Sequence, residues 1–132
     1  MTVYVLDSFA LLALLRYESG SDRIAALLRE AEKGTSRVLM SLISLGEVAY
    51  IIERRWGETR LRSFLAYTYA APLEFAPVDQ DRVLAAAHIK AHYPISYADA
   101  FVVALAQKLD ATVVTGDPDF RKVEGLISVE WL

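Results

Sequence analysis

Four acidic residues have the types and positions needed to share one reaction: Asp7, Glu47, Asp99 and Asp117. Carboxylates gathered in one crevice repel each other and resist desolvation, and a hard divalent cation relieves both effects. Oxygen ligands without His or Cys favour Mg²⁺ or Mn²⁺ over zinc. A metal-bound water can be directed at a phosphodiester, so these acids predict metal-dependent hydrolysis.

Each of these acids also has a purely structural interpretation as a helix cap. Ser44-x-x-Glu47 and Ser96-x-x-Asp99 have the spacing of capping boxes. Asp117 precedes a proline, which suits the N-cap position of a helix. Taken one at a time, the acids are explained as well by capping as by catalysis.

The helical spacing around two of the acids favours a site over simple caps. The residues three and four positions after Asp99 and Glu47, and seven after Asp99, are apolar or aromatic: Val102, Val103, Ala106, Tyr50 and Ile51. We therefore expect both acids to lie on apolar stripes that face the interior, whereas an acid present only for capping would face water.

Short β-forming runs alternate with helical stretches along the chain. The expected strands are residues 3–6, 37–41, 73–75, 112–115 and 127–131, and the expected helices are residues 9–16, 21–33, 44–55, 58–69, 79–92 and 96–109. This alternation predicts an α/β fold with a mostly parallel sheet. Ligands bind where the carboxyl ends of such strands meet, and Asp7 and Asp117 fall at those ends.

Composition narrows the class of protein. The chain has 132 residues, with 14 Lys and Arg against 17 Asp and Glu, so it is not a uniformly basic DNA-coating protein. With 55% hydrophobic residues it is not disordered, and without cysteine it has no disulfide, thiolate metal site or cysteine nucleophile. The apolar excess predicts a buried homodimer or partner surface.

No apolar run is long enough to span a membrane. The first apolar stretch is interrupted by Asp7, and no basic residue precedes it as in a signal peptide. We therefore expect a cytoplasmic protein that does not associate with membranes.

Four segments together resemble the PIN domain family, and in length and layout its VapC-type ribonuclease toxins. They are Val-Leu-Asp-Ser-Phe at 5–9, Ser-Leu-Gly-Glu-Val at 44–48, Ser-Tyr-Ala-Asp-Ala at 96–100 and Thr-Gly-Asp-Pro-Asp-Phe at 115–120. The resemblance covers essentially the whole chain. It implies a single domain over residues 1–132 with a three-layer α/β/α fold and a central, mostly parallel sheet.

The same resemblance implies a function and assigns residues to it. It implies Mg²⁺- or Mn²⁺-dependent endonucleolytic cleavage of an RNA substrate and a small antitoxin protein as partner. The acidic quartet corresponds to Asp7, Glu47, Asp99 and Asp117, as metal ligands and catalytic groups. Asp119 is an auxiliary to Asp117 or its substitute, and Ser8 and Thr115 occupy hydroxyl positions near the metal.

A basic cluster supplies a second candidate site. Arg54, Arg55, Arg60 and Arg62 flank Trp56, and such a cluster can receive RNA phosphates and stack a base. A solvated helix end anchored by the tryptophan explains the same pattern equally well. The crowded leucines of residues 9–16 are mainly core, with a surplus that suits a groove for a partner helix.

Other functions fit less well. His88 and His92 have a zinc-ligand spacing, but the glutamate of an HExxH motif is missing, so we expect surface histidines. A phosphatase or phospho-acceptor domain needs a lysine after a late strand, and Lys122 is the only nearby candidate. A non-catalytic RNA-binding module and an RNA-processing PIN nuclease outside a toxin–antitoxin system remain alternatives.

Overall fold

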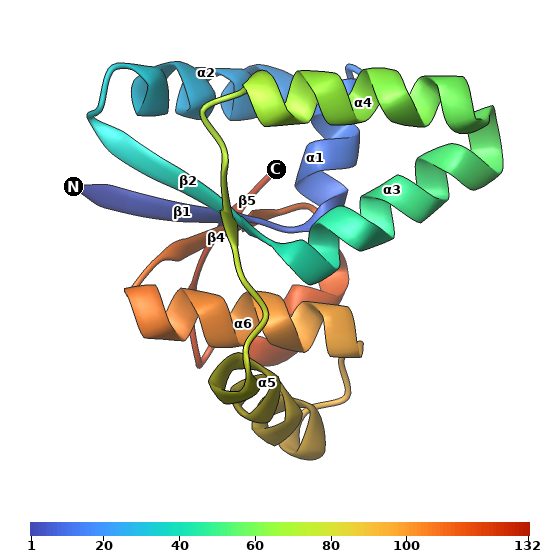
Figure 1. The fold of residues 1–132 in the computed structure, drawn as a ribbon. Coiled ribbons are helices and arrows are strands. Elements are labelled where there is room, and N and C mark those ends of the chain that lie inside the picture. The colour runs from blue at the N-terminus through green and yellow to red at the C-terminus, as the bar shows by residue number, and fades with distance from the viewer.

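A computed structural model describes residues 1–132 and places a five-stranded sheet at the centre of the molecule (Figure 1). The strands are β1 (Thr2–Leu6), β2 (Ser36–Ser41), β3 (Glu74–Ala76), β4 (Thr112–Thr115) and β5 (Ser128–Trp131). Their order is β3-β2-β1-β4-β5, and every neighbouring pair is parallel. The predicted α/β class and the parallel sheet are confirmed.

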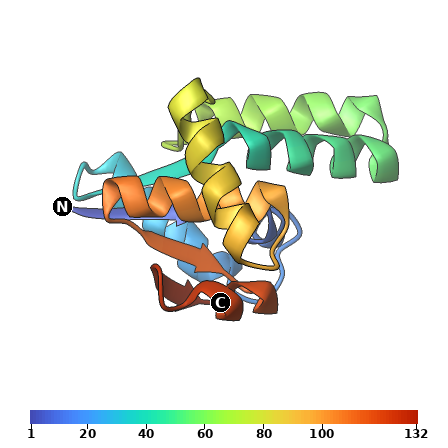
Figure 2. The same ribbon diagram turned by 90° about the horizontal axis from the view of Figure 1, so that it is seen from below.

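Helices cover both faces of this sheet. One face carries α1 (Ser8–Leu15), α2 (Ser21–Glu32), α3 (Leu42–Trp56) and α4 (Glu58–Ala70), and the other carries α5 (Gln80–His92) and α6 (Tyr97–Leu109). Figure 2 shows α5 crossing α6 on the second face. A 3₁₀ helix, η1 (Pro118–Val123), follows β4. None of the helices combines the length and the apolar character that crossing a membrane requires.

The two faces of the sheet bury separate hydrophobic clusters, and alternation along the strands divides residues between them. Leu6 and Val114 belong to the cluster beneath α1–α4, whereas Val5 and Val113 belong to the cluster beneath α5 and α6. Successive side chains of a strand point to opposite faces, so fully apolar strands are required when both faces are covered. The predicted three-layer arrangement follows from these apolar strands.

The predicted capping box at Ser44 and Glu47 is wrong. Helix α3 begins at Leu42, directly after β2, and the hydroxyl of Ser41 accepts the N–H of Ile43 at 3.1 Å as the N-cap. Ser44 is buried within the first turn. Two serines three residues apart offered two possible helix starts, and the earlier one is used. The second predicted box is half confirmed, since the Ser96 hydroxyl accepts the Asp99 N–H at 3.1 Å.

The sheet topology determines where a ligand would bind. Leu6 of β1 pairs with Met40 of β2 on one side and with Val114 of β4 on the other. The next residues along these strands, Asp7 and Thr115 among them, therefore share the carboxyl edge of the sheet. The chain leaves β1 toward β2 and later returns to β4, and such a switch in strand order is where open α/β sheets bind ligands.

Candidate metal centre

Asp7 occupies the centre of this edge and is only 2% exposed. It is the N-cap of α1, because its Oδ1 accepts the N–H of Ala10 at 2.9 Å, and its Oδ2 accepts the hydroxyl of Thr115. Burial raises the pKa of Asp7 to about 7; the two hydrogen bonds oppose this rise, and the charges of Asp99 and Asp117 add to it. Capping and membership of an acidic centre therefore coexist in one residue.

The fully buried hydroxyl of Thr115 links two of the predicted acids. It donates to Asp7 and accepts the backbone N–H of Asp117 at 3.0 Å. A hydroxyl has one proton to donate, and here Asp7 receives it. Thr115 thus orients the Asp7 carboxylate and fixes the turn that presents Asp117.

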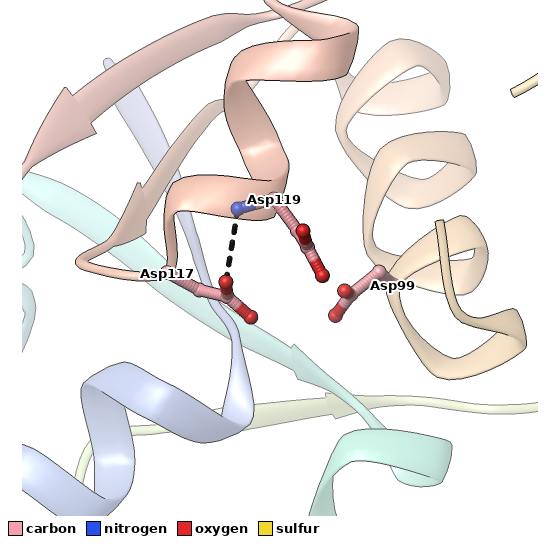
Figure 3. A group of neighbouring side chains, drawn as sticks. All are labelled: Asp99, Asp117 and Asp119. Atoms are coloured by element: carbon pink, nitrogen blue, oxygen red, sulfur yellow. Dashed lines mark hydrogen bonds between the residues drawn. The ribbon is translucent and has the colours of Figure 1, made fainter. Parts of the chain in front are cut away.

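Three aspartates converge in front of this edge. One carboxylate oxygen from each of Asp99, Asp117 and Asp119 lies within 4.8 Å of the others (Figure 3). Asp117 is the N-cap of η1, and its Oδ1 accepts the N–H of Asp119 at 3.0 Å. The first turn of α6 supplies Asp99 from the other side. The cluster therefore combines the C-terminal side of β4 with the start of α6.

Asp99 is 8% exposed, and its pKa is raised to about 6. Burial is the largest cause and the charge of Asp117 the next; a hydrogen bond with Ser96 opposes the rise, and the charges of Glu47 and Asp119 add to it. The predicted apolar stripe behind Asp99 is confirmed, since all of its members are buried: Val102, Val103 and Ala106.

Glu47 lies beside this triad rather than within it. Its Oε1 accepts the hydroxyl of Ser8, the other predicted hydroxyl position, and its charge contributes to the raised pKa of Asp99. The apolar stripe predicted behind Glu47 is wrong in part, because Tyr50 is 51% exposed and Ile51 is half-buried. The face of α3 that bears Glu47 runs from the acidic edge into solvent.

The donor chemistry of this group fits a hard divalent cation. Every side chain that converges offers carboxylate oxygens, and the only ion pair of the three aspartates is between Asp119 and Lys122, whose Nζ lies 3.1 Å from Asp119. Burial is the main cause of the raised pKa values of Asp7 and Asp99, and neighbouring carboxylates add to it, so a bound cation would favour the ionised form of both residues. Oxygen-only sites of this kind suit Mg²⁺ or Mn²⁺.

From the sequence, Lys122 is a candidate for the lysine of a phosphatase or phospho-acceptor site. It contacts the exposed Asp119 and the backbone oxygen of Pro94, at 3.2 Å, and not the strand-end Asp7. Its i,i+3 spacing from Asp119 on η1 was the signal that could have revealed this ion pair.

The four arginines predicted to bind RNA make different contacts. Arg54 lies over the ring of Tyr50 at 5.2 Å, Arg55 lies over Trp56 at 5.4 Å, and Arg62 pairs with Glu58 at 2.9 Å. The fourth, Arg60, lines a groove described below. His88 and His92 are exposed on α5, as expected for surface histidines.

Phe9 and Gly116 are in close contact beside the acids, and no pattern in the sequence predicts this contact. A Cβ added to Gly116 would meet the Phe9 ring at 2.3 Å. Phe9 follows Asp7 by two residues and is 40% exposed, while Gly116 separates Thr115 from Asp117. The glycine is therefore required here for space rather than for an unusual backbone angle.

We expect Gly116→Ala to destabilise the protein by about 1 kcal/mol, because the Phe9 ring must leave its position. In a Phe9→Ala background the same substitution should cost much less, since the clash is gone. Urea unfolding of the four proteins gives the coupling energy. Equal costs in both backgrounds would show that the ring does not explain the glycine.

Comparison with known proteins agrees with this architecture. The PIN domain family model matches residues 4–126. No curated protein matches the chain. VapBC2 from Rickettsia felis bound to a promoter DNA fragment is similar in structure, with a TM-score of 0.76, 18% identity and 98% of both chains covered.

Two further solved structures are similar over nearly their whole length. Mycobacterium tuberculosis VapC20, a sarcin–ricin loop cleaving toxin, has a TM-score of 0.74 and 20% identity, with 96% of this chain and 98% of that chain covered. VapBC-1 from nontypeable Haemophilus influenzae has a TM-score of 0.71 and 18% identity, with 98% of both chains covered. These likenesses show the fold, and the family model covers most of the sequence. The chain therefore belongs to the PIN domain family.

Proposed function

We propose that this protein is a Mg²⁺- or Mn²⁺-dependent endoribonuclease and the toxin of a VapBC-type toxin–antitoxin pair, with residues 1–132 acting as one domain. The observation that carries the proposal is the convergence of aspartates at the switch point of the sheet, with raised pKa values at Asp7 and Asp99. The similarity to VapBC structures supports the toxin role.

The cation would be held by Asp7, Glu47, Asp99 and Asp117, with Asp119 as an auxiliary ligand. When bound, a divalent cation lowers the pKa of a water and neutralises charge on a scissile phosphate. The protein's own contribution is positioning: Thr115 orients the Asp7 carboxylate, and Ser8 orients Glu47. Burial of Asp7 and Asp99 keeps bulk water from screening their charges.

The face of α3 that bears Glu47 offers an RNA strand a route away from the acids. Glu47, Tyr50 and Arg54 follow one another at spacings of three and four residues, which places them on one face of the helix. Tyr50 is exposed and Arg54 covers its ring. Together these two side chains offer a stacking surface and a phosphate contact next to the metal centre.

We expect Arg54→Gln to weaken RNA binding and to reduce the salt dependence of the affinity, with a slope smaller by about 0.7 for single-stranded RNA. Arg62→Gln is the matched control, because Arg62 is already paired with Glu58. Fluorescence anisotropy in Ca²⁺ at several salt concentrations measures the affinity and its salt dependence for each variant. Identical slopes for the two variants would remove Arg54 from the RNA path.

A groove on the opposite side of α3 suits the antitoxin. It has a volume of about 380 Å³ and lies among α1, α3 and α4, with mainly apolar walls: Leu12, Leu15, Ile52, Trp56, Phe64 and Tyr67. Arg16 and Arg60 border it. We propose that a helix of a small antitoxin packs here, and that Arg55 and Arg60 serve this surface rather than the RNA. Two exposed apolar residues, Val78 just before α5 and Leu84 in α5, support the proposed homodimer.

Cleavage of an unstructured RNA by the purified protein tests the proposed function. We expect cleavage in Mn²⁺ and none in EDTA, and we expect Asp99→Asn to reduce the rate by at least about a hundredfold. Asp110→Asn is the matched control, because Asp110 is exposed at the other end of α6 in a left-handed conformation that Asn adopts readily. Equal losses in both variants would contradict the proposal.

A further inference from the structure

A second cavity, of about 210 Å³, lies between α5, α6 and the carboxyl ends of β2 and β3. None of the carboxylates of the metal centre lines it. Most of its wall is apolar, with Ala76, Phe101 and Leu105 among the lining residues, and Ser41, Arg82 and Lys108 add polar groups. It is smaller than the sites of about 300–1,000 Å³ that hold drug-sized ligands.

Arg82 is the unusual feature of this cavity. Its Nε and Nη1 are shielded from solvent and have no hydrogen-bond partner, and the residue forms no ion pair. By contrast, Arg23 and Arg37 each bind both oxygens of a glutamate, Glu130 and Glu74 respectively. Buried guanidinium nitrogens without a partner are costly, so they call for an acceptor. Because Nε and Nη1 have no accessible surface, an acceptor in the cavity would reach them only after a rotation of the Arg82 side chain.

The lining residues indicate the chemistry of that acceptor. Arg82 and Lys108 bring two positive charges, and Asp81 brings one negative charge, so the cavity has a net charge of +1. A planar guanidinium matches a carboxylate or a phosphate. A phosphate dianion would exceed this charge and would place polar oxygens against apolar walls. A monocarboxylate with an apolar body satisfies both the cation and the walls.

We propose that this cavity is a binding site for a small apolar carboxylate, with its carboxylate on Arg82 and its hydrocarbon part against Phe101 and Leu105. Arg82 is placed for this by the start of α5, where its backbone N–H donates to Asp79 Oδ1 at 2.9 Å. The site is separate from the metal centre, and it holds or fails independently of the nuclease proposal.

The probes are benzoate and hexanoate, with benzyl alcohol, 1-hexanol and inorganic phosphate as comparisons. We expect saturable binding of at least one carboxylate in an NMR titration, with shifts at α5 and α6, and no saturable binding of the alcohols or of phosphate. Arg82→Met should weaken the binding about tenfold or more, because it keeps the side-chain bulk and removes the charged donors. Arg62→Met, at an exposed site, should leave binding unchanged.

A measurement without ligand keeps the proposal falsifiable if Arg82 has a structural role. Because Arg82→Met removes unpaired buried nitrogens, the variant should be at least as stable to urea as the wild type. A destabilised variant would mean that Arg82 already has a partner, and would overturn the proposal. Binding of neither carboxylate, or equal binding of phosphate, would also overturn it. So would a dimer that Arg82→Met converts to monomer in sedimentation, since a second copy would then supply the acceptor.

Discussion

In EDTA at pH 8, Asp7→Asn is expected to be more stable than the wild type, and this advantage should disappear near pH 4. The folded pKa of Asp7 is about 7, against an ordinary value of 3.8. Between these values the folded protein keeps a proton that the unfolded chain has released. The contribution of Asp7 to the free energy of unfolding is therefore greatest below about pH 4. It is lost as the pH rises to about 7.

The pKa shift of Asp7 determines how large this difference in stability is. A rise of about three pKa units corresponds to at most ~4 kcal/mol at pH 8, because each unit is ~1.4 kcal/mol. Asn can still accept the Ala10 N–H with its side-chain oxygen, so the cap of α1 is retained. The hydrogen bond that Thr115 donates to Asp7 is lost, because the Asn amide nitrogen is itself a donor. We expect a net gain of about 1–3 kcal/mol at pH 8 after this loss.

Urea unfolding of both proteins from pH 4 to pH 8 measures the difference directly. Titrating groups distant from Asp7 cancel because both proteins contain them, whereas Asp99 and Asp117 interact with Asp7 and contribute to the difference. Asp110→Asn is the control, since its carboxylate is exposed at the end of α6. If Asp7→Asn were less stable than the wild type at every pH, Asp7 would be a favourable ionised cap and not a strained member of an acidic centre.

Millimolar Mn²⁺ is expected to stabilise the wild type strongly at pH 7.5 and Asp99→Asn much less. A ligand at a hundred times its Kd adds ~2.7 kcal/mol to the stability of the state that binds it. In EDTA the variant should be at least as stable as the wild type. The loss of negative charge at the start of α6 costs about 0.3–1 kcal/mol. The variant also avoids the cost of burying a charged carboxylate and its repulsion by neighbouring acids, which together raise the Asp99 pKa to about 6. This gain offsets the loss at the helix terminus.

Thermal unfolding of the wild type, Asp99→Asn and Asp110→Asn in EDTA and in Mn²⁺ separates a metal site from a set of helix caps. Asp110→Asn should respond to Mn²⁺ as the wild type does. Capping alone predicts a different pattern, in which Asp99→Asn is less stable in both conditions and Mn²⁺ shifts none of the three melting temperatures.

The features that could be predicted from the sequence are those with a strong local signal. The apolar strands alternate with helices, and the turn after Thr115 and the apolar stripe behind Asp99 are visible in the residues themselves. In a parallel sheet these signals also determine that Asp7 and Asp117 meet at one edge. Topology therefore accounts for the predictable part of the candidate site.

The features that escaped prediction depend on which helix faces are covered. Helical spacing puts Tyr50 on the side of Glu47 but cannot show that this part of α3 projects beyond the sheet with α4, as Figure 1 shows. The four arginines are close in sequence, yet their contacts differ: Arg54 lies over Tyr50, Arg55 lies over Trp56 and Arg62 pairs with Glu58. The unpaired nitrogens of Arg82 likewise result from the packing of α5 against α6.

The most direct test of the central claim compares metal binding and RNA cleavage in one titration. Single-turnover cleavage and thermal stabilisation are measured on the same wild-type and Asp99→Asn samples as Mn²⁺ is raised from zero. We predict that both signals rise with the same Mn²⁺ midpoint in the wild type, and that Asp99→Asn loses cleavage and moves the midpoint of stabilisation to higher concentration. Cleavage that persists in EDTA, or that Asp99→Asn retains at the wild-type rate, would contradict the assignment of these carboxylates as a catalytic metal centre.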